Sequence, residues 1–140
     1  MKIGIDFGIT HTDVVKVSSD EISFHSAPSS LIQGSIEKVV HSFEISNEIE
    51  AIFVTGGKSS DLSNTFNGIP VTYMNEINSI AHGAKKLYGL KESALIVSTG
   101  TGTACVHFDG VSGNHMGGIA VGGGMLCGLG SLLFNNGDAL

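Results

Sequence analysis

Short glycine turns in this chain carry carboxylate, hydroxyl and amide groups of the kind that can hold phosphate and Mg²⁺. In the first turn, Asp6 ends an apolar strand-like run, and Gly8 and Thr10 follow it. Backbone N–H groups of such a turn can hold phosphate, and a carboxylate beside them can bind hydrated Mg²⁺. An ordinary hairpin with an acidic strand end has the same pattern. Local chemistry leaves these two interpretations open.

A second turn repeats this arrangement near the middle of the chain. It contains three threonines and two glycines within Ser98–Thr103, and its candidate phosphate contacts are Thr99, Gly100, Thr101 and Gly102. A hairpin turn explains these residues equally well. Two such turns in equivalent positions of two similar units favour a phosphate chain held between lobes.

A run of glycines forms the third candidate site. Gly117 and Gly118 precede the Gly122–Gly124 triplet, which begins an apolar helical pattern. Free N–H groups and the helix dipole favour anions at such a helix start. Close packing of the helix on a strand explains the glycines too, and both interpretations can hold together.

Glu76 stands at the start of another predicted helix. The helix dipole stabilises a carboxylate there without any special role. The functional interpretation makes Glu76 a general base that acts on a hydroxyl substrate. The residues alone favour the first interpretation.

Three other patterns are discounted. Gly57–Ser59 resembles the end of a P-loop, but Ile52 occupies the place of a required glycine. The six histidines lack zinc-site spacing. Cys105 and Cys127 form no CxxC motif, which argues against a disulfide framework and favours a reducing cytosol.

Apolar periodicity predicts the elements that must position these groups. Eleven of the 20 glycines lie between Gly100 and Gly130, which places a domain boundary near residue 93. The first unit, residues 1–92, is expected to contain strands Lys2–Asp6, Thr12–Val17, Glu21–His25, Glu50–Thr55 and Pro70–Tyr73 and helices Ser35–Phe43 and Asn75–Tyr88. The second, residues 93–140, repeats the opening with strands Ala94–Ser98, Thr103–Phe108 and Asn114–Met116 and helix Gly124–Phe134.

Composition narrows the class of protein. The 140 residues are 41% hydrophobic, which excludes a disordered chain. The net charge is −6 and all seven basic residues are lysine, so a nucleic-acid partner is not expected. An uncharged stretch at residues 111–137 is too rich in glycine for a membrane span. A cytoplasmic protein is expected.

Several of these segments resemble one superfamily of phosphate-binding proteins. GIDFGIT with the following VVKV resembles the first phosphate loop of the acetate kinase, sugar kinase, heat-shock chaperone and actin superfamily, and VSTGTGT resembles its second. MGGIAVGGGMLCGLGSLL is similar to a segment of the type II pantothenate kinases that reads close to RVGG-T-x-IGGG-T-x-x-GLG-x-LL. Asn75–Glu76 resembles the catalytic glutamate helix of that family, and VTGG at residues 54–57 resembles its glycine turn. The resemblance implies a ribonuclease H-like (actin-like ATPase) α/β fold, with one complete lobe and the start of a second.

The resemblance also implies an activity, which is ATP-dependent phosphorylation of pantothenate in the first step toward coenzyme A. Asp6 is expected to assist Mg²⁺ binding, and Glu76 to take the proton from the substrate hydroxyl. The remaining implied contacts are Gly8, Thr10, Thr99, Gly100, Thr101, Gly102, Gly122, Gly123 and Gly124 for ATP, and His115, Gly117 and Gly118 for the substrate.

The chain departs from this family at three points. His115 or Met116 stands where the family has an arginine. Ile9 replaces a glycine, and the family's next-strand lysine corresponds to Asp13 or Lys16, depending on register. Family members are also longer, so we expect the second lobe to be completed by a partner, with a homodimer as one form, or to be missing.

Two alternative functions remain open. Another small-molecule kinase or ATPase of the same fold, such as an N-acetylhexosamine kinase, would use the same loops. A non-catalytic module that binds nucleotide or acyl-CoA would explain the absence of arginine. Retention of Asp6, Glu76 and both threonine–glycine turns favours catalysis.

Overall fold

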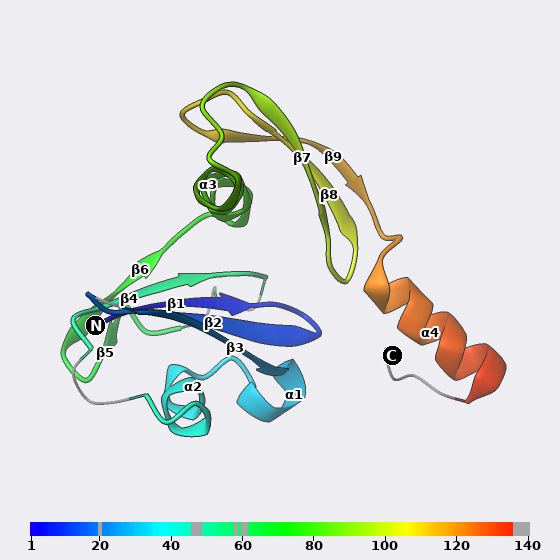
Figure 1. Ribbon diagram of the computed structural model, residues 1–140. Coiled ribbons are helices and arrows are strands. Elements are labelled where there is room, and N and C mark those ends of the chain that lie inside the picture. The colour runs from blue at the N-terminus through cyan, green and yellow to red at the C-terminus, as the bar shows by residue number, and fades with distance from the viewer. Residues whose placement is uncertain (20, 46–48, 58, 60–61, 136–140) are drawn as a thin grey trace. The chain divides into compact units, whose positions relative to one another are not determined.

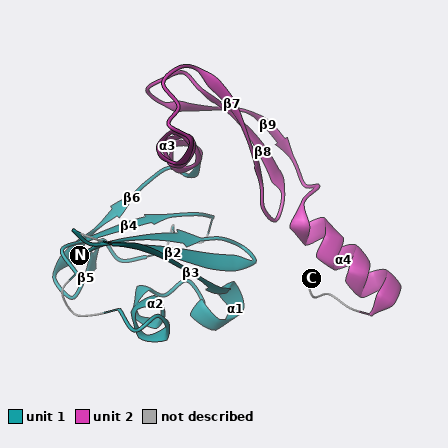
Figure 2. Cartoon of the chain, in the orientation of Figure 1, with its two compact units in different colours: residues 1–76 teal, residues 77–140 magenta. Residues whose placement is uncertain are grey.

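The chain forms two compact units, residues 1–76 and residues 77–140 (Figure 2). The computed structural model describes residues 1–19, 21–45, 49–57, 59 and 62–135. The division lies after Glu76, whereas the glycine distribution indicated residue 93. The reason is that Ile77, Ile80 and Ala81 pack against apolar residues that follow in the chain.

Unit 1 is built on a six-stranded sheet with two short helices on one side (Figure 1). The strand order is β3-β2-β1-β4-β6-β5, and β1 pairs in parallel with β4, which pairs in parallel with β6. The other pairings are antiparallel. The elements are β1 (Lys2–Phe7), β2 (His11–Val17), β3 (Ile22–Pro28), α1 (Ser29–Ile32), α2 (Ile36–Ser42), β4 (Ala51–Thr55), β5 (Thr65–Phe66) and β6 (Ile69–Tyr73).

The core of unit 1 follows from the two-residue period of its strands. Ile3, Ile5 and Phe7 alternate on β1 with Lys2, Gly4 and Asp6, and only the first set is buried. Residues Ile32, Ile36 and Val39 of the two helices join that buried cluster. Ser35 caps α2 by accepting a hydrogen bond from the Lys38 amide at 3.3 Å.

Unit 2 contains a three-stranded antiparallel sheet, β7-β8-β9, and most of α3. The elements are α3 (Glu76–Tyr88), β7 (Ala94–Thr99), β8 (Thr103–Phe108), β9 (Gly113–Ile119) and α4 (Gly123–Phe134). Ala81, Val106 and Phe108 form the buried centre. Gly113 allows the strand to approach α3, because a β-carbon there would lie 2.7 Å from Ala81 Cβ.

Much of the apolar surface of unit 2 is exposed within the described residues. Helix α4 contains no buried residue, and Leu126, Leu132 and Phe134 are more than two-thirds exposed. Leu95 and Val97 project from one side of β7 and are also exposed. None of the described helices has the length and apolar character needed to cross a bilayer. Cys105 and Cys127 are both free thiols.

Most expected elements are found, with small shifts of their ends. Two elements were not expected, α1 and β5, which have four and two residues. The third strand of unit 2 was expected at Asn114–Met116 and extends instead over Gly113–Ile119. Each unit contains three consecutive antiparallel strands, β1-β2-β3 in unit 1 and β7-β8-β9 in unit 2, as the expected repetition of architecture requires.

Candidate active site

The carboxyl ends of three neighbouring parallel strands meet at one edge of the sheet in unit 1. Asp6 of β1 lies beside Thr55 of β4, and Val54 of β4 lies beside Tyr73 of β6. The residues that follow these strand ends include Gly56 and Glu76. Ligands of open α/β sheets bind outside the carboxyl ends of the strands, so this edge is the candidate active site of unit 1.

Asp6 is surrounded by negative charge at this edge. Desolvation by the surrounding protein raises the pKa of Asp6, and the charges of Glu76 and Asp13 raise it further. Asp6 and Glu76 are therefore close enough to interact electrostatically. A cation bound at this edge would relieve the repulsion between the carboxylates.

The register of β1 and β2 decides which residue occupies the position opposite Asp6. Asp13 is its pairing partner, whereas Lys16 pairs with Ile3 farther along the strand. Lys16 shares a face of β2 with the buried residues Thr12 and Val14, and Asp13 lies on the other face. Asp13 thus stands beside Asp6, and the described lysine of β2, Lys16, lies farther along the strand.

The turn between β1 and β2 is held by Ser29 at the start of α1, a residue that was not singled out from the sequence. The Ser29 hydroxyl donates to Gly8 O at 2.7 Å, and the Ser29 amide donates to Thr10 O at 2.9 Å. The buried Thr12 hydroxyl lies 3.1 Å from Ser29 Oγ. These bonds fix the Gly8–Thr10 turn beside Asp6. The sequence shows only two adjacent serines after Pro28, and the burial that distinguishes Ser29 from Ser30 is visible only in the structure.

Gly56 begins a tight turn at the end of β4. Its φ is +92°, and its carbonyl oxygen accepts hydrogen bonds from the Ser59 amide at 3.1 Å and the Ser59 hydroxyl at 2.7 Å. Ser59 of the discounted motif therefore belongs to this turn, and Lys58 lies outside the described residues.

In unit 2, the Thr99–Thr103 turn contacts the start of α4. The Gly123 amide donates to Gly100 O at 2.8 Å, and the Gly124 amide donates to Thr101 O at 3.0 Å. A β-carbon on Gly122 would lie 2.7 Å from Thr101 O. The triple glycine therefore lets a helix start pack directly on a hairpin turn.

This packing supports the second of the two interpretations given for the triple glycine. The amides of Gly123 and Gly124 are both hydrogen-bonded to the turn. The Gly100 amide is also engaged, because it donates to Gly102 O at 2.8 Å. The structure brings the two glycine segments together, and close packing accounts for part of their glycine content.

His115 and Met116, one of which is expected to stand at the family's arginine position, lie at an irregularity of β9. Val106 pairs with His115 and Cys105 pairs with Gly117, so Met116 is the extra residue of a bulge. Gly117 has φ +147°, which favours glycine. A β-carbon on Gly118 would lie 2.6 Å from Thr103 O, so this glycine permits close pairing with β8. His115 and Met116 are both exposed.

The carboxylate ligand available at the strand ends of unit 1 suits a Mg²⁺ ion that is also coordinated by phosphate. Mg²⁺ commonly takes one or two carboxylates and completes its shell with phosphate and water. Among the described residues, no three His, Cys, Asp or Glu side chains gather as a metal cluster. Asp6 supplies an exposed carboxylate at the strand end, which is the kind of ligand such an ion uses.

Sequence comparison finds relatives among the type II pantothenate kinases. The chain is 33% identical over 139 residues to the enzyme of Staphylococcus aureus strain USA300, and 32% identical to that of the bovine strain RF122. Each match covers 95% of this chain and 49% of the relative. The chain thus spans about half the length of these curated relatives. No protein-family model matches the chain.

Solved structures with similar architecture include sugar kinases. The chain matches a 2-dehydro-3-deoxygalactonokinase from Sinorhizobium meliloti, described as putative, with a TM-score of 0.64 and 7% identity over 94% of this chain and 56% of that one. A glucokinase from Streptomyces griseus matches with a TM-score of 0.61 and 17% identity, over 84% of this chain and 47% of that one. At these identities the matches establish the fold, which is the actin-like, ribonuclease H-like α/β fold that the sequence indicated.

The sequence match and the fold agree with each other. The sequence match extends over 95% of the chain. The structural matches cover 94% and 84% of the chain and establish its fold. The chain is therefore a distant homologue of the type II pantothenate kinases, corresponds to about half of their length and has the actin-like ATPase fold.

Proposed function

We propose that the protein takes part in ATP-dependent phosphorylation of pantothenate, as the part of such a kinase that provides the catalytic carboxylates. The observation that carries this proposal is the interaction of Asp6 with Glu76 at the carboxyl ends of the parallel strands. Phosphoryl transfer depends mainly on positioning and on neutralisation of charge, and these two carboxylates suit both tasks.

Each carboxylate has a separate task in this proposal. Asp6 would hold Mg²⁺, which when bound would neutralise charge on the phosphates of ATP. Glu76 would accept the proton of the pantothenate hydroxyl as that oxygen attacks phosphorus. Gly56 leaves room for the Asp6 carboxylate, and Ser29 holds the neighbouring turn with Gly8 and Thr10.

Unit 2 would supply further contacts from its own residues. The Thr99–Gly102 turn would contact phosphate through the threonine hydroxyls and the remaining amide groups. His115, Gly117 and Gly118 would contact pantothenate at the β9 bulge, where an imidazole replaces the fork of an arginine side chain. The Gly122–Gly124 segment would support the phosphate turn by packing against it.

The exposed apolar surface of unit 2 supports packing of further polypeptide there. Contiguous exposed apolar residues on a folded unit commonly mark a surface that another segment covers. The curated relatives are about twice as long as the matched region, and the partner in this proposal is either such additional chain or a second copy.

The test measures binding and turnover separately. Isothermal titration of the chain with a non-hydrolysable Mg-ATP analogue, with and without pantothenate, is expected to show saturable binding of both ligands. ADP release with pantothenate as acceptor is expected to fall at least about 100-fold in Glu76→Gln, while nucleotide affinity stays unchanged. Glu37→Gln is the matched control, because Glu37 is also an exposed glutamate in the first turn of a helix.

Three outcomes contradict parts of the proposal. Absence of binding of both ligands contradicts nucleotide and pantothenate binding by this chain. Normal turnover in Glu76→Gln contradicts the role of Glu76 as base. Phosphorylation of glucose or N-acetylglucosamine in place of pantothenate would identify a sugar kinase of the same fold.

A second candidate is a nucleotide-binding or acyl-CoA-binding module without catalysis. The observation that favours it is the pairing of Asp13 with Asp6, which puts an additional negative charge where a cation would assist phosphate binding. This candidate predicts binding of nucleotide or acyl-CoA with no ADP release from any acceptor, and equal binding by wild type and Glu76→Gln.

A further inference from the structure

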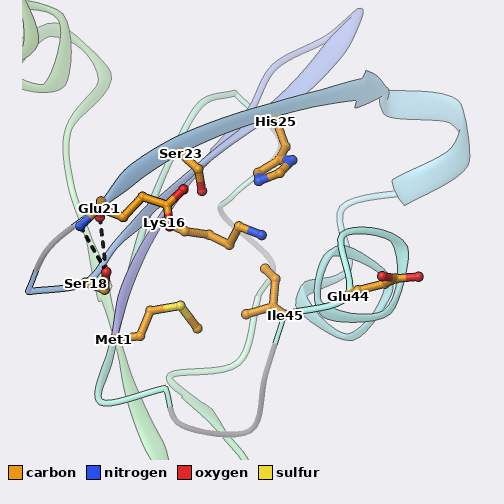
Figure 3. Close-up of a pocket in the computed structure, with 8 residues that line it drawn as sticks. All are labelled: Met1, Lys16, Ser18, Glu21, Ser23, His25, Glu44 and Ile45. Carbon is orange, nitrogen blue, oxygen red and sulfur yellow. Dashed lines mark hydrogen bonds between the residues drawn. The ribbon is translucent and has the colours of Figure 1, made fainter.

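Unit 1 contains a cavity at the end of the sheet opposite the candidate active site. It has a volume of about 340 Å³ and lies between β2, β3 and the residues that follow α2 (Figure 3). The side chains that matter here are Lys16 of β2, Ser23 and His25 of β3, and Ile45 after α2. A cavity of this size can hold a small organic molecule.

Strand register separates this cavity from Asp6. Lys16 pairs with Ile3 and Asp13 pairs with Asp6, so the two positions are three residues apart on β2. At about 3.3 Å per residue this is roughly 10 Å along the strand. Lys16 also lies on the face that α1 and α2 cover, whereas Asp13 and Asp6 lie on the other face. A ligand in the cavity would therefore be bound apart from the candidate active site.

The cavity contains polar groups that other described residues leave unsatisfied. His25 Nε2 is buried and has no hydrogen-bond partner in the described part of the chain. The Lys16 ammonium and the Ser23 hydroxyl form no hydrogen bond or ion pair with the described residues either. An unsatisfied buried nitrogen destabilises the folded state, and a bound ligand group could satisfy it.

These groups lie on one side of the cavity. Ser23 and Lys16 are directly paired across β2 and β3, and His25 is the next residue of β3 on the same face. Figure 3 shows the Lys16 side chain extending under the His25 ring, toward Ile45. The His25 ring is held in place by the Phe43 ring, whose centroid lies 5.5 Å away.

The groups beside Lys16 favour one class of ligand, although the lining as a whole contains two carboxylates, those of Glu21 and Glu44, and one lysine. The single ammonium of Lys16 matches a single negative charge, and His25 and Ser23 add hydrogen-bonding groups. Ile45 and Met1 provide an apolar surface for the rest of the ligand. Glu21 and Glu44 are at the same cavity, and their carboxylates would repel a doubly charged phosphate more strongly than a carboxylate.

We propose that this cavity binds a small monocarboxylate with a short apolar body, whose carboxylate contacts Lys16, Ser23 and His25. This proposal does not depend on the activity proposed above.

The test uses butyrate as the probe with the full 140-residue chain. Nitrogen-15 NMR of the histidine side chains is expected to show a saturable shift of the His25 ring signal on titration with butyrate. Lys16→Met keeps the length of the side chain and removes its charge, and should weaken butyrate binding at least about tenfold. Lys91→Met is the matched control, because it removes one positive charge from an exposed position in unit 2.

A second variant separates ligand binding from packing. His25→Phe keeps a ring against Phe43 and removes the nitrogen, so it should fold normally by circular dichroism and bind butyrate more weakly. Absence of a saturable shift with butyrate, or equal butyrate affinity in Lys16→Met and Lys91→Met, overturns the proposal. Tighter binding of butylammonium or inorganic phosphate than of butyrate overturns the proposed ligand class.

Discussion

A β-carbon built on Gly56 would lie 2.3 Å from Oδ1 of Asp6, so the turn after β4 and the end of β1 fit together only when residue 56 is glycine. The same atom would lie 2.6 Å from Phe7 O. The glycine turn and the proposed Mg²⁺ ligand are thus parts of one packed arrangement, although fifty residues separate them in the chain.

Gly56→Ala should destabilise unit 1 and displace the Asp6 carboxylate. The substitution combines a clash with backbone and side-chain atoms with a positive φ, so we expect a loss of about 1–3 kcal/mol in the free energy of unfolding. Gly57→Ala is the control, because a β-carbon there meets nothing within 4 Å. Urea unfolding of both variants measures the difference, and equal midpoints would show that the turn relaxes freely.

Asp6→Asn should raise the melting temperature at pH 7. The folded state raises the pKa of Asp6 above its ordinary value of 3.8, so the folded protein holds this proton more tightly than the unfolded chain. Stability therefore falls as the pH rises from 3.8 through the folded pKa, and the asparagine variant avoids this loss. The gain in melting temperature should disappear below pH 3.8. Asp6→Asn should also weaken Mg²⁺-dependent nucleotide binding.

Replacement of Asp109 by asparagine should change the melting temperature in the opposite direction from replacement of Asp6. Hydrogen bonds from the Ser112 and Val111 amides lower the pKa of Asp109 to about 2. Its contribution to stability is present above pH 3.8 and is lost as the pH falls toward 2. Asp109→Asn should therefore lower the melting temperature at pH 7. A rise in both variants would mean that reduction of net charge, and not the local contacts, controls stability.

Ser29→Ala should loosen the turn beside Asp6. It removes the hydrogen bond to Gly8 O and leaves the buried Thr12 hydroxyl without this neighbour, which should cost about 1–3 kcal/mol. Ser30→Ala changes an exposed serine next to it and serves as the control. Hydrogen exchange of the amides in residues 8–10 should accelerate in Ser29→Ala alone, and unchanged exchange would contradict a positioning role.

Replacement by alanine should have opposite effects at Gly122, the N-cap of α4, and at Gly128 inside the helix. Gly122→Ala places a β-carbon 2.7 Å from Thr101 O and should separate the helix start from the turn, with a loss of stability. Gly128→Ala meets nothing within 4 Å and should stabilise the helix by up to about 1 kcal/mol. Thermal unfolding compares the two, and stabilisation by both would contradict close packing of turn and helix.

The sequence alone determined most of the elements and the class of chemistry. Apolar residues at a period of two placed β1, β4 and β8 closely, because one side of each strand must be buried. Helical spacing placed α3 and α4 in the same way. The glycine turns and their carboxylates indicated the superfamily, since these local features need no knowledge of distant contacts.

Only the tertiary structure decided which residues meet. The β1–β2 register placed Asp13, and not Lys16, beside Asp6, and it left Lys16 at the cavity with His25. Packing of α4 on the Thr99–Thr103 turn engaged the amides of Gly123 and Gly124, and packing of α3 on β8 moved the unit boundary to Glu76. Strand register and helix docking depend on partners far away in the chain, so periodicity along the sequence cannot specify them.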